Sequence, residues 1–190
     1  MRLLLLSGIL LAASLAEAQS GNTGANASRL PDPPYLNQVY YYWSDSLLAC
    51  PRTDGQMSNK IKALGFGGSQ MSYAMDGGRS ALRIKAGDSL RFVVKMVSMA
   101  GDPSSVVKLY KFESKKDSRE ALLSSQSRFG GSKDPKNEVS YDVRRSGSDV
   151  FILIPSARLA PGEYAFMNSM MMKQSGVSVM YTFFTFGVDP

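Results

Sequence analysis

Asp149-Val-Phe-Ile-Leu-Ile-Pro155 opens the region that decides the fold, residues 148–188, where the sequence predicts three strands around one corner. An unbroken apolar run of this length is typical of a strand buried on both faces. The turn Leu159-Ala-Pro-Gly-Glu-Tyr164 follows it, because proline presets φ and glycine tolerates a positive φ. Strands are then expected over residues 164–168 and 177–186, on either side of a Met-rich segment.

The residues Leu159, Pro161, Gly162 and Tyr164 form a Leu-x-Pro-Gly-x-Tyr pattern. This pattern resembles the turn and tyrosine found near the end of many immunoglobulin-like and prealbumin-like sandwiches, where the hydroxyl bonds back to the backbone. The resemblance implies a sandwich with a buried Tyr164 whose hydroxyl meets backbone near Leu159. It covers about six residues and implies no activity.

The rest of the chain predicts further short strands and no convincing helix. Asp76-Gly-Gly78 lies between two such segments and predicts a hairpin, whereas residues 51–55 are expected to form a loop and residues 60–64 a weak strand. We therefore expect one all-β domain over residues 35–190. A mostly antiparallel β-sandwich of about eight or nine strands is the best description, with a β-barrel as the alternative.

The first 18 residues have the pattern of a secretory signal peptide. Arg2 precedes an apolar run from Leu3 to Leu15, and Ala16-Glu-Ala18 is a small-x-small cleavage site. Residues 19–34 are rich in Ser, Asn, Gly and Pro and predict a flexible leader. The chain is therefore expected to be exported to a bacterial periplasm or the extracellular space, without a transmembrane segment.

The composition excludes several chemistries. The chain has no histidine, which excludes Ser-His-Asp triads, Cys-His pairs and His-ligated metals. The single cysteine, Cys50, excludes an intramolecular disulfide and a Cys₄ zinc site, and is expected to be a small apolar side chain rather than a nucleophile. A disulfide-free exported domain favours a bacterial envelope. No cofactor is expected.

A basic cluster is the candidate binding surface. It would meet an anionic glycan, another envelope component or an acidic protein, although lysines on an edge strand also guard against aggregation. Export and a net charge of only +6 argue against nucleic acid. The cluster consists of Lys108, Lys111, Lys115, Lys116 and Arg119.

Aromatic side chains are a second candidate. Tyr40, Tyr42, Tyr73 and Trp43 could form a stacking platform for a sugar. For Trp43 we expect core packing instead.

The best-supported function is a non-enzymatic binding or structural module whose ligand the sequence does not identify. Two alternatives remain. Met170, Met171 and Met172 could bind Cu(I) through their thioethers, although such residues usually fill core gaps or form adaptable surfaces. A carboxylate-dependent hydrolase would need two acids across a cleft, whereas turn chemistry explains most acids here, and Glu163 and Asp189 suggest nothing more.

Overall fold

The computed structural model describes residues 30–61, 68–87, 89–97, 102–126, 132–133, 137–176 and 178–190. The predicted signal peptide, most of the predicted leader and residues 62–64 of the weak strand expected at 60–64 lie outside these residues. The described part confirms the all-β class, with fifteen strands rather than eight or nine. No helix within these ranges is both long and apolar enough to cross a membrane.

The strands follow one another as β1 (Val39–Trp43), β2 (Ser46–Ala49), β3 (Arg52–Ile61), β4 (Ser69–Asp76), β5 (Arg83–Lys85), β6 (Phe92–Lys95), β7 (Val107–Ser114), β8 (Ser118–Gln126), β9 (Ser132–Lys133), β10 (Glu138–Val139), β11 (Tyr141–Arg145), β12 (Val150–Pro155), β13 (Gly162–Asn168), β14 (Lys173–Ser175) and β15 (Ser178–Asp189). Two short 3₁₀ helices, η2 (Pro103–Ser105) and η3 (Ser169–Met171), accompany them.

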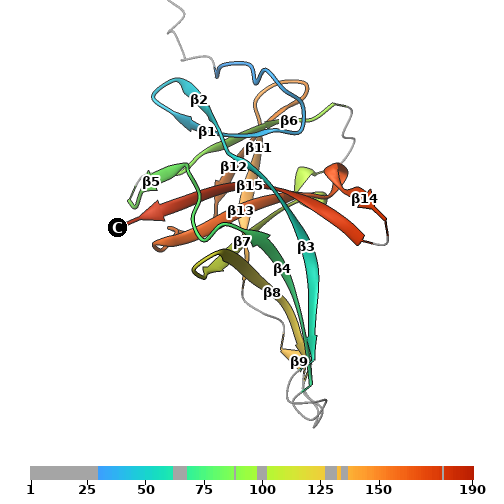
Figure 1. Cartoon of the computed structure of the whole chain (residues 1–190). Helices are drawn as coiled ribbons and strands as arrows, with labels where there is room; N and C mark the ends of the chain where they lie inside the picture. The colour runs from blue at the N-terminus through green and yellow to red at the C-terminus, as the bar shows by residue number, and fades with distance from the viewer. Residues whose placement is uncertain are drawn as a thin grey trace, which may run out of the picture.

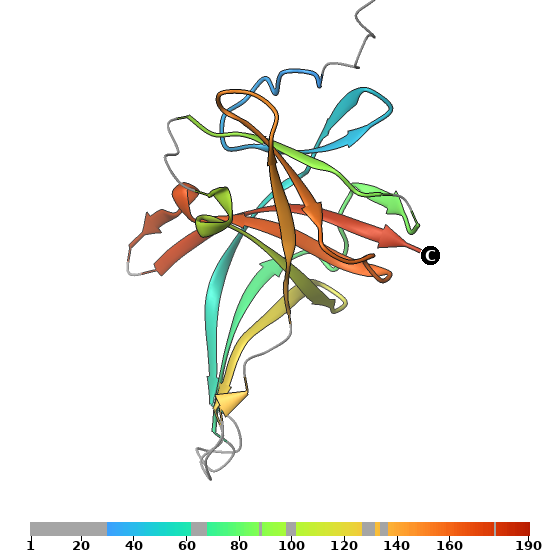
Figure 2. The same ribbon diagram turned by 180° about the vertical axis from the view of Figure 1, so that it is seen from behind.

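The strands form two sheets. A five-stranded sheet has the order β11-β12-β6-β1-β2. In the larger sheet, β7-β13-β15-β3-β4-β8 close into a six-stranded barrel, because β8 returns to β7 through the pairs Glu113↔Glu120 and Ser114↔Arg119. The five-stranded sheet lies against the outside of β7, β13 and β15 (Figure 1; Figure 2 shows the reverse side). The structure thus combines the predicted sandwich with the barrel that was its alternative.

Two hydrophobic cores result, and β13 and β15 contribute to both. On β13, Tyr164 and Phe166 face the five-stranded sheet, whereas Ala165 and Met167 fill the barrel. Side chains alternate along a strand, so a strand between two cores must be apolar at nearly every position. The barrel core consists of Tyr73, Met75, Tyr110, Phe112, Ala121, Ala165, Met167 and Phe183.

The prediction that residues 149–155 are buried on both faces is wrong. Phe151 and Leu153 of β12 lie in the sandwich core, but Ile152 and Ile154 on the opposite face are only half-buried. No third layer covers β12 among the described residues, so its outer apolar side chains remain partly in water.

The contact expected of Tyr164 is present, whereas the resemblance to immunoglobulin-like sandwiches stays a prediction. Tyr164 is buried, and its hydroxyl donates a hydrogen bond of 2.8 Å to the carbonyl oxygen of Ala160. Gly162 has φ of 155°, and Leu159 is buried beside it.

Strands β3, β4 and β8 extend beyond the barrel as an arm (Figure 1). The sequence prediction of a loop at 51–55 was wrong, because β3 runs continuously from Arg52 to Ile61. The polar residues on the outward face of β3 do not give the alternating apolar pattern by which a strand is predicted. On the inward face, only glycine fits at position 55. A Cβ there would lie 2.8 Å from the Phe183 ring and 2.7 Å from the Ala74 carbonyl oxygen.

The predicted hairpin at Asp76-Gly-Gly78 is also wrong. β4 pairs with β3 and β8, whereas β5 pairs in parallel with β15. The segment between β4 and β5 instead packs against the turn that joins β7 and β8. Gly78 permits this approach, because a Cβ would lie 2.3 Å from the carbonyl oxygen of Lys115.

Replacing Tyr164 with phenylalanine tests the corner. The Tyr164→Phe variant should lose about 1 kcal/mol of unfolding free energy, because the Ala160 carbonyl loses its donor while the ring stays packed. Urea denaturation measures the change. Tyr35→Phe is the matched control, since Tyr35 is 70% exposed; an equal loss in both variants would contradict the corner's role.

Candidate functional site

The structure does not gather the predicted basic cluster on one surface. The ammonium of Lys108 lies 3.2 Å from Glu138, and that of Lys111 lies over the Tyr164 ring at 5.9 Å from its centroid. Lys116 is exposed in the turn between β7 and β8. Lys115 and Arg119 belong to two different sites.

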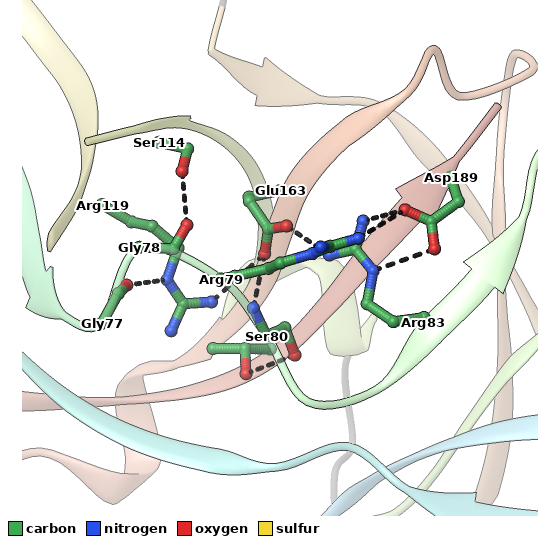
Figure 3. Close-up of polar contacts among 10 residues, drawn as sticks. Gly77, Gly78, Arg79, Ser80, Arg83, Ser114, Arg119, Glu163 and Asp189 are labelled. Atoms are coloured by element: carbon green, nitrogen blue, oxygen red, sulfur yellow. Dashed lines mark hydrogen bonds and ion pairs between the residues drawn. The ribbon is translucent and has the colours of Figure 1, made fainter. Parts of the chain in front are cut away.

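Arg119 lies inside one end of the barrel and is only 3% exposed (Figure 3). Its Nε donates to the carbonyl oxygen of Gly77 at 2.7 Å, and its Nη1 lies 3.5 Å from Glu163 Oε2 without forming a hydrogen bond. Burial lowers the pKa of this guanidinium; Glu163 opposes the shift and Arg83 adds to it. Arg119 therefore serves the interior, not a binding surface.

Glu163 is the centre of this buried ionic cluster (Figure 3). Its carboxylate accepts a hydrogen bond of 2.8 Å from the Ser80 backbone and forms an ion pair with Arg83. Arg83 in turn binds Asp189, whose pKa is lowered chiefly by that hydrogen bond. The cluster ties the segment after β4 to β8, β13 and the end of β15.

The geometry makes this cluster a structural lock. Cations or backbone donors occupy both carboxylates, and Glu163 is only 5% exposed. Arg83 also lies so close to Gly187 that a Cβ there would be 1.7 Å from Nη1. A substrate could reach Glu163 only if Arg83, Arg119 and the Ser80 backbone were displaced from it.

A pocket of about 360 Å³ opens on the outer wall of the barrel, where β7 leaves β8. Beyond their two shared pairs, β10 takes the place of β8 beside β7. We call this site the charged pocket. Its lining consists of Lys60, Gln70, Ser72, Glu113, Lys115, Glu120 and Leu122.

Two glutamates face each other in the charged pocket. Glu113 and Glu120 are directly opposite in the antiparallel β7–β8 pair, a position that places Cβ atoms about 4.5–5.5 Å apart. The Glu120 carboxylate accepts hydrogen bonds from Lys60 at 2.7 Å and from Lys115 at 2.6 Å. These two bonds lower its pKa, and the bond from Lys115 has the larger effect. The side-chain carboxylate of Glu113 forms no hydrogen bond or ion pair within the described part of the chain.

This arrangement suits binding better than catalysis. Two lysines and two glutamates make the pocket electrically neutral, and the free carboxylate of Glu113 can only accept hydrogen bonds. A glycosidase also needs a carboxylic acid kept protonated by its surroundings, whereas Glu113 is exposed and Glu120 is held by two cations. The described residues hold no cluster of three or more acids or cysteines suited to a metal ion.

The three methionines of the copper alternative have different surroundings. Met171 packs against the sandwich core, whereas Met170 and Met172 are 52% and 49% exposed.

Among the other candidates, Cys50 is buried, and burial raises the pKa of its thiol. Tyr40 and Tyr73 are buried too, so the described structure does not join them to an exposed platform. The expectation of core packing for Trp43 is wrong. Its ring stacks on Tyr41 with centroids 6.2 Å apart but stays 52% exposed, at the last position of β1 before the turn to β2.

Sequence reasoning named Lys115 but missed Lys60, Glu113 and Glu120. A partial signal was present, because a tight turn at 115–117 between two strands places Glu113 opposite Glu120. Lys60 could not be found this way, since it reaches the pocket from β3, two strands away from β8.

The buried ionic cluster predicts a large effect for Glu163→Gln. The amide can still accept from Ser80, but Arg119 would be left buried without an opposite charge. We expect a loss of about 3 kcal/mol in unfolding free energy, measured by urea denaturation. Asp189→Asn is the control, since that carboxylate lies on the exposed side of Arg83; an equal or larger loss there would contradict the lock.

The ion pairs of Glu120 should make the stability of the fold depend on pH. The folded pKa of Glu120 lies below the ordinary glutamate value of 4.5, so its stabilising ion pairs are fully present above that pH. They are lost as the pH falls through the folded pKa, because the unfolded chain takes up the proton first. Glu120→Gln should lower stability at neutral pH and flatten the fall in stability below pH 4.5. Thermal melts across this range, with Glu113→Gln as the control, measure it; the same acid slope in Glu120→Gln and wild type would argue against the pairs.

Comparisons with known proteins do not assign this chain to a family. No protein-family model matches the chain, and no curated protein or solved structure matches it either. The function must therefore be inferred from the residues and their arrangement.

Proposed function

We propose that the chain is an exported, non-enzymatic binding module of a bacterial envelope or the extracellular space, and that the charged pocket binds a glycan. Export rests on the signal-peptide pattern of residues 1–18. The observation that carries the ligand class is the free carboxylate of Glu113, which faces the Glu120 carboxylate already paired with Lys60 and Lys115.

The ligand must bring hydrogen-bond donors. An ionised carboxylate accepts two or more hydrogen bonds and donates none, so adjacent hydroxyl groups of a sugar complement Glu113. Lys60 and Lys115 already neutralise Glu120, so charge complementarity does not favour an anionic ligand in this pocket. Gln70 and Ser72 supply further donors and acceptors, and Leu122 supplies an apolar wall.

In the described part of the chain, packed side chains occupy the barrel interior. Tyr73 packs edge to face against both Tyr110 and Phe183 there, with ring centroids 5.5 and 5.3 Å away. Such contacts fill the interior with side chains. A ligand is therefore expected on the outer wall.

Titration calorimetry with neutral oligosaccharides tests the proposal. The probes are chitotetraose, cellotetraose and maltotetraose, with tetragalacturonate as the anionic comparison and purified peptidoglycan in a pull-down. At least one neutral probe should bind. Glu113→Gln should then weaken binding by roughly tenfold or more, because hydrogen bonds to charged groups contribute about 1.5–3 kcal/mol.

A matched control separates binding from folding. Glu138→Gln also neutralises an exposed glutamate on a strand paired with β7, but its residue does not line the charged pocket. It should leave affinity unchanged. The proposal fails if no neutral probe binds, or if Glu113→Gln binds as tightly as wild type. Release of new reducing ends would identify a hydrolase instead.

A further inference from the structure

The outer edge of β2 has unpaired backbone groups. Ser44 and Asp45 have φ of 47° and 59°, the two positive values that define a type I′ hairpin turn between β1 and β2. In such a hairpin Trp43 and Ser46 form the first hydrogen-bonded pair, so Tyr42 and Leu47 form a pair without hydrogen bonds. The Tyr42 backbone indeed donates to Arg91, on the side away from β2.

The N–H and C=O groups of Leu47 and Ala49 therefore point away from β1. No strand in the described part of the chain lies on that side, since β2 ends the five-stranded sheet. Four backbone hydrogen-bonding groups, two donors and two acceptors, face outward from this strand.

The two edges of this sheet differ in their protection. The opposite edge, β11, exposes Asp142, Arg144 and Arg145, and charged side chains block pairing between edges. β2 reads Ser-Leu-Leu-Ala and has neither charge nor proline. Leu48 on this strand is 45% exposed, and Trp43 on the adjacent strand is 52% exposed on the same face. β2 is thus an uncharged edge with apolar side chains in water.

We propose that β2 pairs antiparallel with β2 of a second copy of this chain, around a twofold axis at Leu48. This register places Leu47 opposite Ala49 of the partner and Leu48 opposite Leu48. All outward N–H and C=O groups of both strands then bond across the interface, as four hydrogen bonds in total.

The side chains of β2 favour a second copy over an unrelated strand. Leu48 would lie in a pair without hydrogen bonds, where Cα atoms come within about 4.5 Å and side chains meet closely. No like charges face each other, because the strand has none. A strand this short makes a small interface, so the association should be reversible and concentration-dependent. The surface belongs to the five-stranded sheet and is separate from the charged pocket.

Sedimentation velocity across a concentration series tests the pairing. The wild-type mass should rise toward twice the monomer mass. Leu48→Lys and Leu48→Glu should each remain monomeric, because like charges would face each other across the axis. An equimolar mixture of the two variants should restore the dimer, since Lys then faces Glu.

Leu47→Pro provides an independent test of the hydrogen bonds. It removes an outward N–H but no β1–β2 hydrogen bond, so the monomer should keep its fold while dimerisation is lost. Circular dichroism and melting temperature confirm the fold of each variant. A wild type that stays monomeric at every concentration overturns the proposal. The proposal is also overturned if the Leu48→Lys variant still dimerises, or if the mixture of Leu48→Lys and Leu48→Glu does not form a dimer.

Discussion

Two strands, β13 and β15, are buried on both faces, and the rest of the architecture follows from this constraint. Their side chains alternate between the sandwich core and the barrel core. Phe166 and Phe186 face one core and Phe183 faces the other, and all three have no exposed surface. Burying a side chain of this size contributes about 1.5–3 kcal/mol, so both layers must be in place for either strand to be stable.

The same constraint explains the ionic cluster. Glu163 and Thr185 occupy barrel-facing positions at the end of these two strands, where the interior meets the segment after β4. A carboxylate there must be paired, because an isolated buried charge is strongly unfavourable. Arg83 and Arg119 supply the opposite charge, and the Ser80 backbone supplies a hydrogen bond. The chain after β4 is thus held across the barrel end instead of folding back as a hairpin.

The parts of the fold that were predictable are those whose local pattern has a single interpretation. The corner at Leu159 to Tyr164 depends on four residues in one turn, and it forms as expected. β3 was missed because its two faces are unlike those of a usual strand. One face is polar and exposed, and the other carries Gly55, which the ring of Phe183 covers.

Long-range contacts explain the remaining errors. Gly78 follows the pattern of a hairpin turn, yet it meets the carbonyl oxygens of Lys115 and Lys116, which lie far away in sequence. Arg119 was assigned to a surface cluster because its neighbours are lysines. Strand alternation instead turns it inward while Glu120 turns outward. A one-residue step along β8 thus separates the structural site from the candidate binding site.

The charged pocket arises from the way the barrel closes. The half of β7 that places Val107 and Leu109 in the sandwich core pairs with β13 and β10 and not with β8. Closure is therefore limited to the two residue pairs at Glu113 and Ser114, and the seam opens beyond them. Glu113 and Glu120 lie at the last closed position, on strands held by both cores. Backbone pairing sets the spacing of their Cβ atoms, so the pocket wall carries two facing glutamates, one with a paired carboxylate and the other with a carboxylate free to accept hydrogen bonds.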